Sequence, residues 1–195
     1  FLGISYMTFR AVDALLDLWD GKVERLVPLD YSYFLLFAPA VSSGPLDRYR
    51  RFVRDLDQPR TGEEYAVLVR DGVWRIMTGA LYYFVFGNLI WRCWIEALPA
   101  GGAGHWIGYF YGYTFFMFFN FAGYSRMAIG TAYLLGIRVP ENFNRPFLSV
   151  DMKEFWGNWH ISLSSWLRDY IYIPLGGNRV GKVRHSLNIL ITFLV

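Results

Sequence analysis

The hydrophobic positions of this chain fall into long runs separated by polar, arginine-rich segments. The strongest run, Ala97 to Ser125, contains no Asp, Glu, Lys or Arg. After a glycine-rich loop at 98–104, residues 106–121 are aromatic or aliphatic on nearly every side, which is typical of a helix in lipid or in a bundle. The pattern predicts a membrane span near 106–125. A core helix of a soluble protein is the alternative, which so many aromatics disfavour.

Three weaker runs complete the pattern. The stretch 76–95 begins with a charge-free segment between two arginines and predicts a second span. Residues 31–41 are apolar but contain Pro39, which predicts a short or broken helix. The run 187–195 is apolar but shorter than the roughly 20 residues of a full span. We therefore expect an all-α protein, a polytopic transmembrane helical bundle with short re-entrant or interfacial helices.

Both ends of the chain lie inside apolar runs, Phe1–Phe9 and 187–195. We interpret both ends as truncations and expect residues 1–195 to be part of a single membrane domain. Arginines and lysines gather between 47 and 75 and again after Arg138, whereas the loop between the two best spans has none. The positive-inside rule places the basic segments in the cytoplasm, so the sequence predicts a multi-pass protein of the cytoplasmic membrane.

Composition narrows the functional classes. Charged residues make up only 18% of the chain, below the quarter that is usual for soluble proteins, and the net charge of +3 does not indicate nucleic-acid binding. The single cysteine, Cys93, excludes an internal disulfide. There is no phosphate-binding loop, paired CxxC or G-x-S-x-G motif, so the sequence supports no nucleotide hydrolysis, no metal site and no serine-hydrolase chemistry.

The segment after Arg138 differs from the rest of the chain. Asp151 followed by Glu154 is a typical helix start, and Pro174 lies where a helix must stop. The sequence therefore predicts one motif helix near 151–172, with His160 inside an aromatic stripe. The other residues of that face are Trp156, Trp159, Leu163, Leu167 and Tyr170, and the opposite face holds Asn158, Ile161, Ser162, Ser165 and Asp169.

His160 is the candidate catalytic residue. An imidazole can accept a proton at neutral pH, and partial burial would keep it neutral. A packing or interfacial role is the alternative, and it is the common one for a single histidine. We interpret His105 and His185 as structural, and Arg168 with Asp169 as a structural polar contact.

Three motif blocks, in this order, resemble the bacterial membrane-bound O-acyltransferases. They are Phe121-Ala122-Gly123-Tyr124-Ser125 with Met127 to Gly130, Pro140 to Phe147, and Phe155 to Tyr170 continuing to Arg179. The opening residues and the block Ser42 to Tyr49 are similar to the branch that transfers D-alanine to teichoic acid. The block Tyr172 to Arg179 is more typical of the alginate-acetylating branch.

The resemblance implies a reaction and a set of partners. It implies transfer of an acyl group, D-alanyl or acetyl, from a thioester to a hydroxyl of a cell-envelope polymer such as teichoic acid or an exopolysaccharide. The donor would be a phosphopantetheine carrier protein or an acetyl thioester, with no bound cofactor. A carrier protein could dock from the cytoplasm on the arginines at 48–54, membrane lipid would surround the helices, and no nucleic acid is expected.

The resemblance also assigns residues. His160 corresponds to the first family histidine and would orient a reacting group or share the role of base. The second histidine, in a later Trp-His-Gly motif, would lie beyond Val195, so we expect these 195 residues alone to be inactive. Asn120 departs from the acidic residue that often precedes the first block. A transporter or channel component, or a non-catalytic scaffolding member of the family, is the alternative function.

Overall fold

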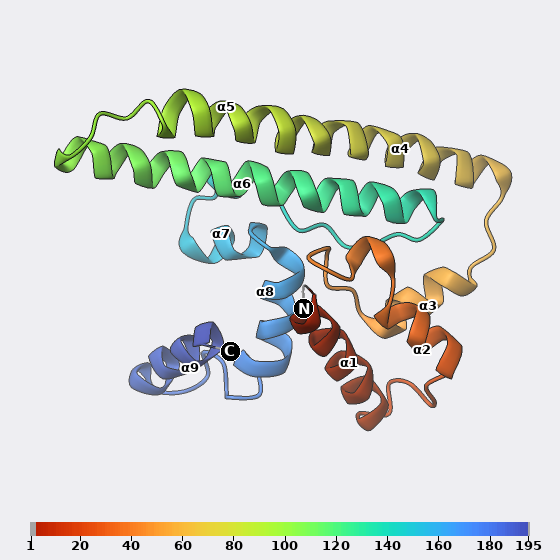
Figure 1. The fold of residues 1–195 in the computed structure, drawn as a ribbon. Helices are drawn as coiled ribbons and strands as arrows, with labels where there is room; N and C mark the ends of the chain where they lie inside the picture. The colour runs from red at the N-terminus through yellow and green to blue at the C-terminus, as the bar shows by residue number, and fades with distance from the viewer. Residues whose placement is uncertain (1–2, 195) are drawn as a thin grey trace. The chain divides into compact units, whose positions relative to one another are not determined.

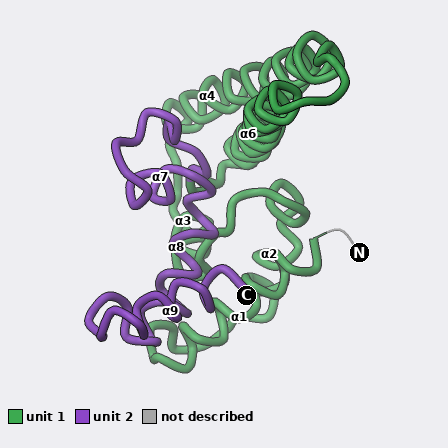
Figure 2. The backbone as a smooth tube through the Cα atoms, turned by 90° about the vertical axis from the view of Figure 1, so that its left-hand side faces the viewer, with its two compact units in different colours: residues 1–140 green, residues 141–195 purple. Residues whose placement is uncertain are grey.

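A computed structural model describes residues 3–194, and all regular structure in that range is helical (Figure 1). Among these residues β-type backbone pairing is limited to an isolated bridge between Phe143 and Trp159. The chain divides into two compact units, residues 1–140 and residues 141–195 (Figure 2). The predicted all-α class is confirmed.

Unit 1 contains several short helices followed by a long helical hairpin. The short elements are α1 (Ile4–Trp19), α2 (Pro28–Leu35), the 3-10 turn η1 (Ala38–Ala40) and α3 (Tyr49–Asp57). The first arm of the hairpin is α4 (Gly62–Ala80), the π-helical segment η2 (Leu81–Gly87), the turn α5 (Asn88–Ile90) and a second π-helical segment, η3 (Trp91–Ile95). The second arm is α6 (Gly102–Leu134), which lies alongside the first arm in both views (Figures 1 and 2).

Glycines set the closest approach between the two arms. A Cβ atom on Gly79 would lie 2.7 Å from the carbonyl oxygen of Gly123, and one on Gly123 would lie 2.8 Å from the carbonyl oxygen of Gly79. Gly72 and Gly130 meet in the same reciprocal way, at 2.8 and 2.6 Å. In each arm the two glycines are two helical turns apart and so share one face. The arms therefore pack backbone against backbone, which only small residues permit.

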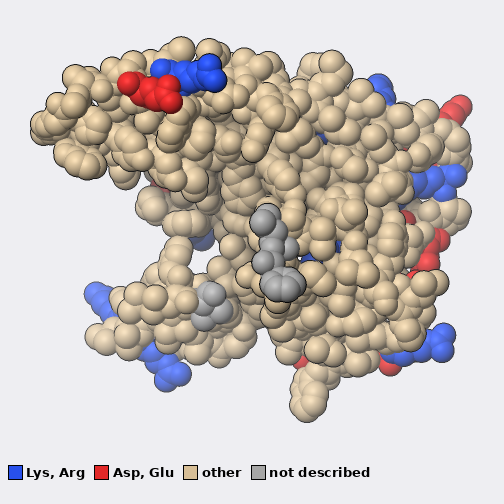
Figure 3. Space-filling view, in the orientation of Figure 1, with Lys and Arg blue, Asp and Glu red and all other residues tan. Residues whose placement is uncertain are grey.

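Large apolar side chains cover much of the outer surface of the hairpin. Trp74, Trp106 and Phe110 are each about two-thirds exposed, at 64%, 67% and 66%. On the face shown in Figure 3, charged side chains are sparse over the hairpin, which lies along the top of the view. Burial of such aromatic side chains is strongly favourable, so this surface is suited to an apolar environment or partner.

The predicted membrane spans correspond to helices with one exception. Segments 76–95, 106–125 and 187–194 are helical, whereas 31–41 is broken between α2 and η1, as Pro39 led us to expect. Val195 lies outside the described residues. Measured by length and hydropathy together, none of the helices within residues 3–194 reaches the requirement for crossing a membrane.

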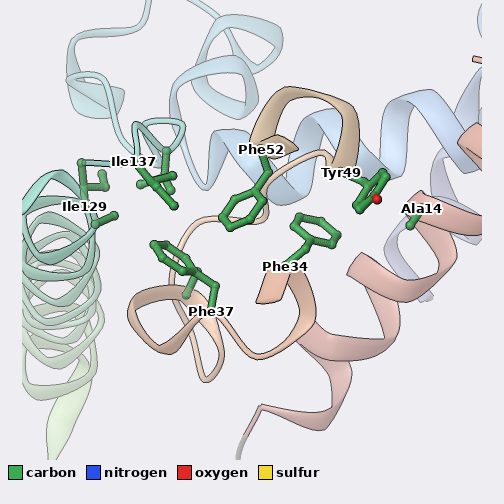
Figure 4. Packing of buried hydrophobic residues seen from close by; sticks show 10 residues of the cluster. Ala14, Phe34, Phe37, Tyr49, Phe52, Ile129 and Ile137 are labelled. Carbon is green, nitrogen blue, oxygen red and sulfur yellow. The ribbon is translucent and has the colours of Figure 1, made fainter. Parts of the chain in front are cut away.

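An aromatic cluster forms the core of unit 1 (Figure 4). Phe34, Phe37 and Phe52 are at most 1% exposed, and the ring of Phe52 lies 5.3 and 5.1 Å from the rings of the other two. Ile129 near the end of α6 and Ile137 just after it belong to the same cluster, so the hairpin and the short helices share one core. Tilted and edge-to-face ring pairs of this kind add about 1 kcal/mol each beyond the area that they bury.

Two arginines of the 47–54 segment are bound to buried carboxylates. Arg48 places Nη1 2.7 Å from Oδ1 of Asp13, a residue of α1 that is fully buried. Arg51 donates from Nε and Nη2 to the buried Asp47, at 2.7 and 2.5 Å. Because a buried carboxylate needs a partner, these two arginines stabilise the fold and are unavailable for docking.

Unit 2 contains shorter helices. They are the 3-10 turn η4 (Pro146–Leu148), α7 (Met152–Asn158), α8 (Ile161–Leu167), the π-helical segment η5 (Arg168–Tyr172) and α9 (Lys182–Leu194). The prediction of one continuous helix near 151–172 was wrong, since the chain breaks at Trp159 and His160. Its start was predicted correctly, because Oδ1 of Asp151 accepts a hydrogen bond from the amide of Glu154 at 2.7 Å. The end at Tyr172 precedes Pro174, as expected.

The glycine contacts lead to a stability prediction. Gly123→Ala places a methyl group against backbone atoms of the first arm, so the arms must separate, and we expect a loss of about 1–3 kcal/mol in the free energy of unfolding. Gly104→Ala is the matched control, because it lies in the first turn of α6 with no atom within 4 Å of the added carbon. Thermal unfolding of both variants tests this prediction, and equal midpoints would contradict it.

Candidate active site

His160 lies in a backbone conformation that is unusual for its residue type. Its φ and ψ are 45° and 51°, in the left-handed region, and it occupies the N-cap position of α8. In the part of the chain that the structure describes, only Arg145 shares a positive φ among non-glycine residues. This conformation costs roughly 1–2 kcal/mol for a residue with a Cβ atom and persists only where neighbouring structure imposes it.

The neighbouring structure that imposes it is the segment 142–144. The amide of Asn144 donates to the carbonyl oxygen of Asn158 at 3.0 Å, and the amide of Ile161 donates to the carbonyl oxygen of Asn142 at 2.9 Å. These two bonds flank the bridge between Phe143 and Trp159. The second and third motif blocks are therefore joined physically, on both sides of His160.

Aromatic rings pack around the residue before His160. Trp159 stacks on Phe155 at 5.6 Å with an interplanar angle of 16°, and it meets the ring of Phe143 edge-on at 5.2 Å. Phe147 approaches the same indole at 6.1 Å. The tryptophan next to His160 in the chain is thus fixed by three rings. Trp159 therefore has a packing role in unit 2.

Burial controls the charge of His160. It lowers the pKa of the imidazole to about 4, so that the ring is neutral at physiological pH. A neutral imidazole can both donate and accept a hydrogen bond. Within residues 3–194 no group of three or more His, Cys, Asp or Glu side chains is arranged to hold a metal ion. The neutral imidazole itself can support hydrogen bonding and proton transfer.

The remaining predicted residues have mixed outcomes. Arg168 and Asp169 form the expected polar contact, with Nε 2.9 Å from Oδ1, but the pair is largely exposed and contributes little. Ser162, which the helical pattern placed on a polar face directed away from the site, is buried and bonded to Asn142 at 2.5 Å. Its position is set by the contact with Asn142, because the chain breaks between α7 and α8 and no continuous helix relates Ser162 to α7.

Sequence reasoning also missed a second polar arrangement in unit 2. The side chain of Asn188 on α9 donates to the carbonyl oxygens of Leu175 and Gly177, at 3.1 and 3.2 Å. Nε2 of His185 lies 3.0 Å from the hydroxyl of Tyr172. These bonds fix the loop between η5 and α9, in agreement with a structural role for His185. The sequence signal that could have indicated this arrangement is Asn188, a single asparagine within the apolar run 187–195.

The family model for membrane-bound O-acyltransferases matches residues 14–195, nearly the whole chain. The chain belongs to the membrane-bound O-acyltransferase family. Within this family it is similar to two kinds of curated protein. Teichoic acid D-alanyltransferase of Bacillus subtilis (strain 168) is 48% identical over 177 residues, which cover 89% of this chain and 45% of the relative. The protein of the same name from Lacticaseibacillus rhamnosus is 42% identical over 184 residues, with the same coverage.

The second kind of relative is more distant. The probable alginate O-acetylase AlgI of Pseudomonas aeruginosa (strain PAO1) is 35% identical over 200 residues, which cover all of this chain and 37% of the relative. The chain thus spans less than half the length of the relatives that it matches. The resemblance to the membrane-bound O-acyltransferase family, read from three motif blocks, is confirmed.

The first motif block of this family member lies in α6 of unit 1. Gly123 and Gly130 make the closest helix contacts there, so this block has a packing role in the hairpin. Asn120, the position that departs from the family pattern, donates to the carbonyl oxygen of Phe116 at 3.0 Å and lies opposite Gly87. An asparagine at this position is therefore accommodated by its own helix and by a glycine on the other arm.

The low pKa of His160 predicts a loss of stability in acid. The folded-state pKa of about 4 lies below the value near 6.5 in the unfolded chain, so the unfolded state binds more protons between these values. The contribution of the neutral imidazole to the free energy of unfolding is present above about pH 6.5 and is lost as the pH falls toward 4. Relative to His160→Asn, which does not titrate, we expect the wild type to lose on the order of 2 kcal/mol more between pH 7 and pH 4.5. An equal loss of unfolding free energy in the wild type and in His160→Asn between the two pH values would contradict this.

Proposed function

We propose that this chain is the part of an O-acyltransferase that carries one of its site histidines. The full gene product would transfer an acyl group from a thioester to a hydroxyl of a cell-envelope polymer. Membership of the family supports this proposal, as do the relatives named for action on teichoic acid and alginate. The observation that carries it is His160, a neutral imidazole held in a strained conformation by two family motif blocks.

The reaction defines what His160 can do. The hydroxyl oxygen bonds to the thioester carbonyl carbon, the C–S bond breaks, the hydroxyl proton passes to a base, and the departing thiolate takes up a proton. A group with a pKa of about 4 accepts a hydrogen bond but holds a proton weakly, so it is a poor sole base at neutral pH. We assign His160 the role of orienting the attacking hydroxyl, with the second family histidine as the base.

The acyl group is D-alanyl in this proposal. Identity to the D-alanyltransferases is 40–48%, against 34–36% for the alginate O-acetylases. The donor would then be a D-alanyl thioester on the phosphopantetheine arm of a carrier protein. The apolar surface of the hairpin supports a location in the cell membrane, with lipid as the neighbour of its exposed aromatic side chains.

Replacing His160 tests the proposed role. His160→Gly and His160→Asn both tolerate the left-handed backbone, so they remove the imidazole without adding strain. We expect each variant to fold and to transfer acyl groups roughly 10²–10⁴-fold more slowly in the full gene product. His105→Asn, the same change in the first turn of α6, should stay within about twofold of the wild type. Wild-type rates in both His160 variants would contradict the proposed role of His160.

A carrier protein would dock on the two exposed arginines of α3. Within residues 3–194 Arg50 and Arg54 form no ion pair, and they are one helical turn apart on α3. Because carrier proteins are acidic, R50E/R54E should weaken carrier binding at least tenfold at low salt. K182E/R184E makes the same charge change on exposed positions of α9 and should leave binding unchanged. Equal affinity for both double variants would exclude α3 as the dock.

A further inference from the structure

The N-terminus of α8 is capped in an uncommon way. The first amides of a helix have no partner within the helix, and the N-cap side chain usually accepts a hydrogen bond from one of them. Here the N-cap residue is His160, whose side chain makes no such bond. The imidazole is therefore not used to terminate the helix.

Asn142 performs that function from a separate segment. Its carbonyl oxygen accepts from the amide of Ile161 at 2.9 Å, and its side-chain Oδ1 lies 3.4 Å from the amide of Ser162. The same Oδ1 accepts from the hydroxyl of Ser162 at 2.5 Å, the shorter and stronger of the two side-chain contacts. Asn142 and Ser162 are 1% and 4% exposed, so neither exchanges these bonds for water. One residue thus binds both positions that follow the histidine.

The residue before the histidine is fixed as well. The amide of Trp159 donates to the carbonyl oxygen of Phe155 at 2.8 Å, and Trp159 is bridged to Phe143. With both neighbours anchored, the torsions of His160 have little freedom, and the strain of its left-handed conformation is balanced by these contacts. The backbone torsions at this point set the direction of the Cα–Cβ bond from which the imidazole extends.

We propose that Asn142 and Ser162 are positioning residues for His160. They fix the left-handed turn that directs the imidazole at its substrate, and this inference rests on the proposed function. A reacting group displaced by about 1 Å can lose up to 10²-fold in rate, so loss of the buried hydroxyl should lower kcat while ground-state binding persists. The neutral amide of Asn142 suits this buried position, because an aspartate there would bring an additional charge into the interior.

Ser162→Ala in the full gene product is the central variant. It removes the 2.5 Å hydrogen bond, and we expect kcat for acyl transfer to fall on the order of tenfold, with KM for the hydroxyl acceptor within about twofold. Ser165→Ala is the matched control, because its hydroxyl bonds only to the carbonyl oxygen of Ser162 within α8, at 2.9 Å. Ser162→Thr retains the hydroxyl and should recover part of the rate.

A double-mutant cycle separates positioning from general stability. If Ser162 acts through His160, adding Ser162→Ala to His160→Asn should change the remaining rate by less than about twofold. The inference would be overturned if the rate loss of the double variant equalled the product of the two single losses. A normal kcat in Ser162→Ala would overturn it as well. Failure of the proposed function would look different, since His160→Asn alone would then be fully active. Thermal unfolding of each variant confirms that the rates compared belong to folded protein.

Discussion

The hydrogen bonds between segment 142–144 and the break at residues 158–162 are the constraint on which the site depends. They hold His160 in a conformation that its own side chain disfavours, and they separate two helices that the local pattern would merge. The three bonds that Asn142 accepts are individually worth about 1 kcal/mol, so together they offset the cost of one left-handed residue. The left-handed turn at His160 is therefore stable only while segment 142–144 is in contact with residues 158–162.

The same arrangement explains the electrostatics of the site. Burial of the imidazole removes water from it, and loss of hydration favours the neutral form, which lowers its pKa. A neutral imidazole suits a reaction in which a hydroxyl must be aligned before it attacks a thioester. The same group is a weak base, so the chemistry needs a second residue. The proposed function assigns that role to the second family histidine.

Local signals in the sequence predicted much of the fold. The start of α7 at Asp151, the long apolar helix through 106–125 and the interruption near Pro39 were all evident from capping, periodicity and proline chemistry. The start of α4 has an equally local signal, the capping box of Thr61 and Glu64. These features depend on neighbours within one or two turns, and such neighbours are visible in a single chain.

Features that depend on distant partners were not predictable in this way. The periodic pattern continues through His160, and the helix breaks there because of contacts from segment 142–144, far back along the chain. Similarly, the sequence does not distinguish Arg48 and Arg51, which bind buried aspartates, from Arg50 and Arg54, which are exposed. His160 itself was identified from a family motif and from imidazole chemistry, while its backbone strain and its supporting residues came from the structure.

The backbone torsion φ of His160 is the most direct test of this account. It can be measured by solid-state NMR on the full gene product carrying isotope-labelled histidine, with His160→Asn to assign the signal. The account predicts a positive φ near 45°. A value near −63°, as in an uninterrupted α-helix through residues 152–172, would contradict it, because the supporting contacts from Asn142 would then have no turn to hold.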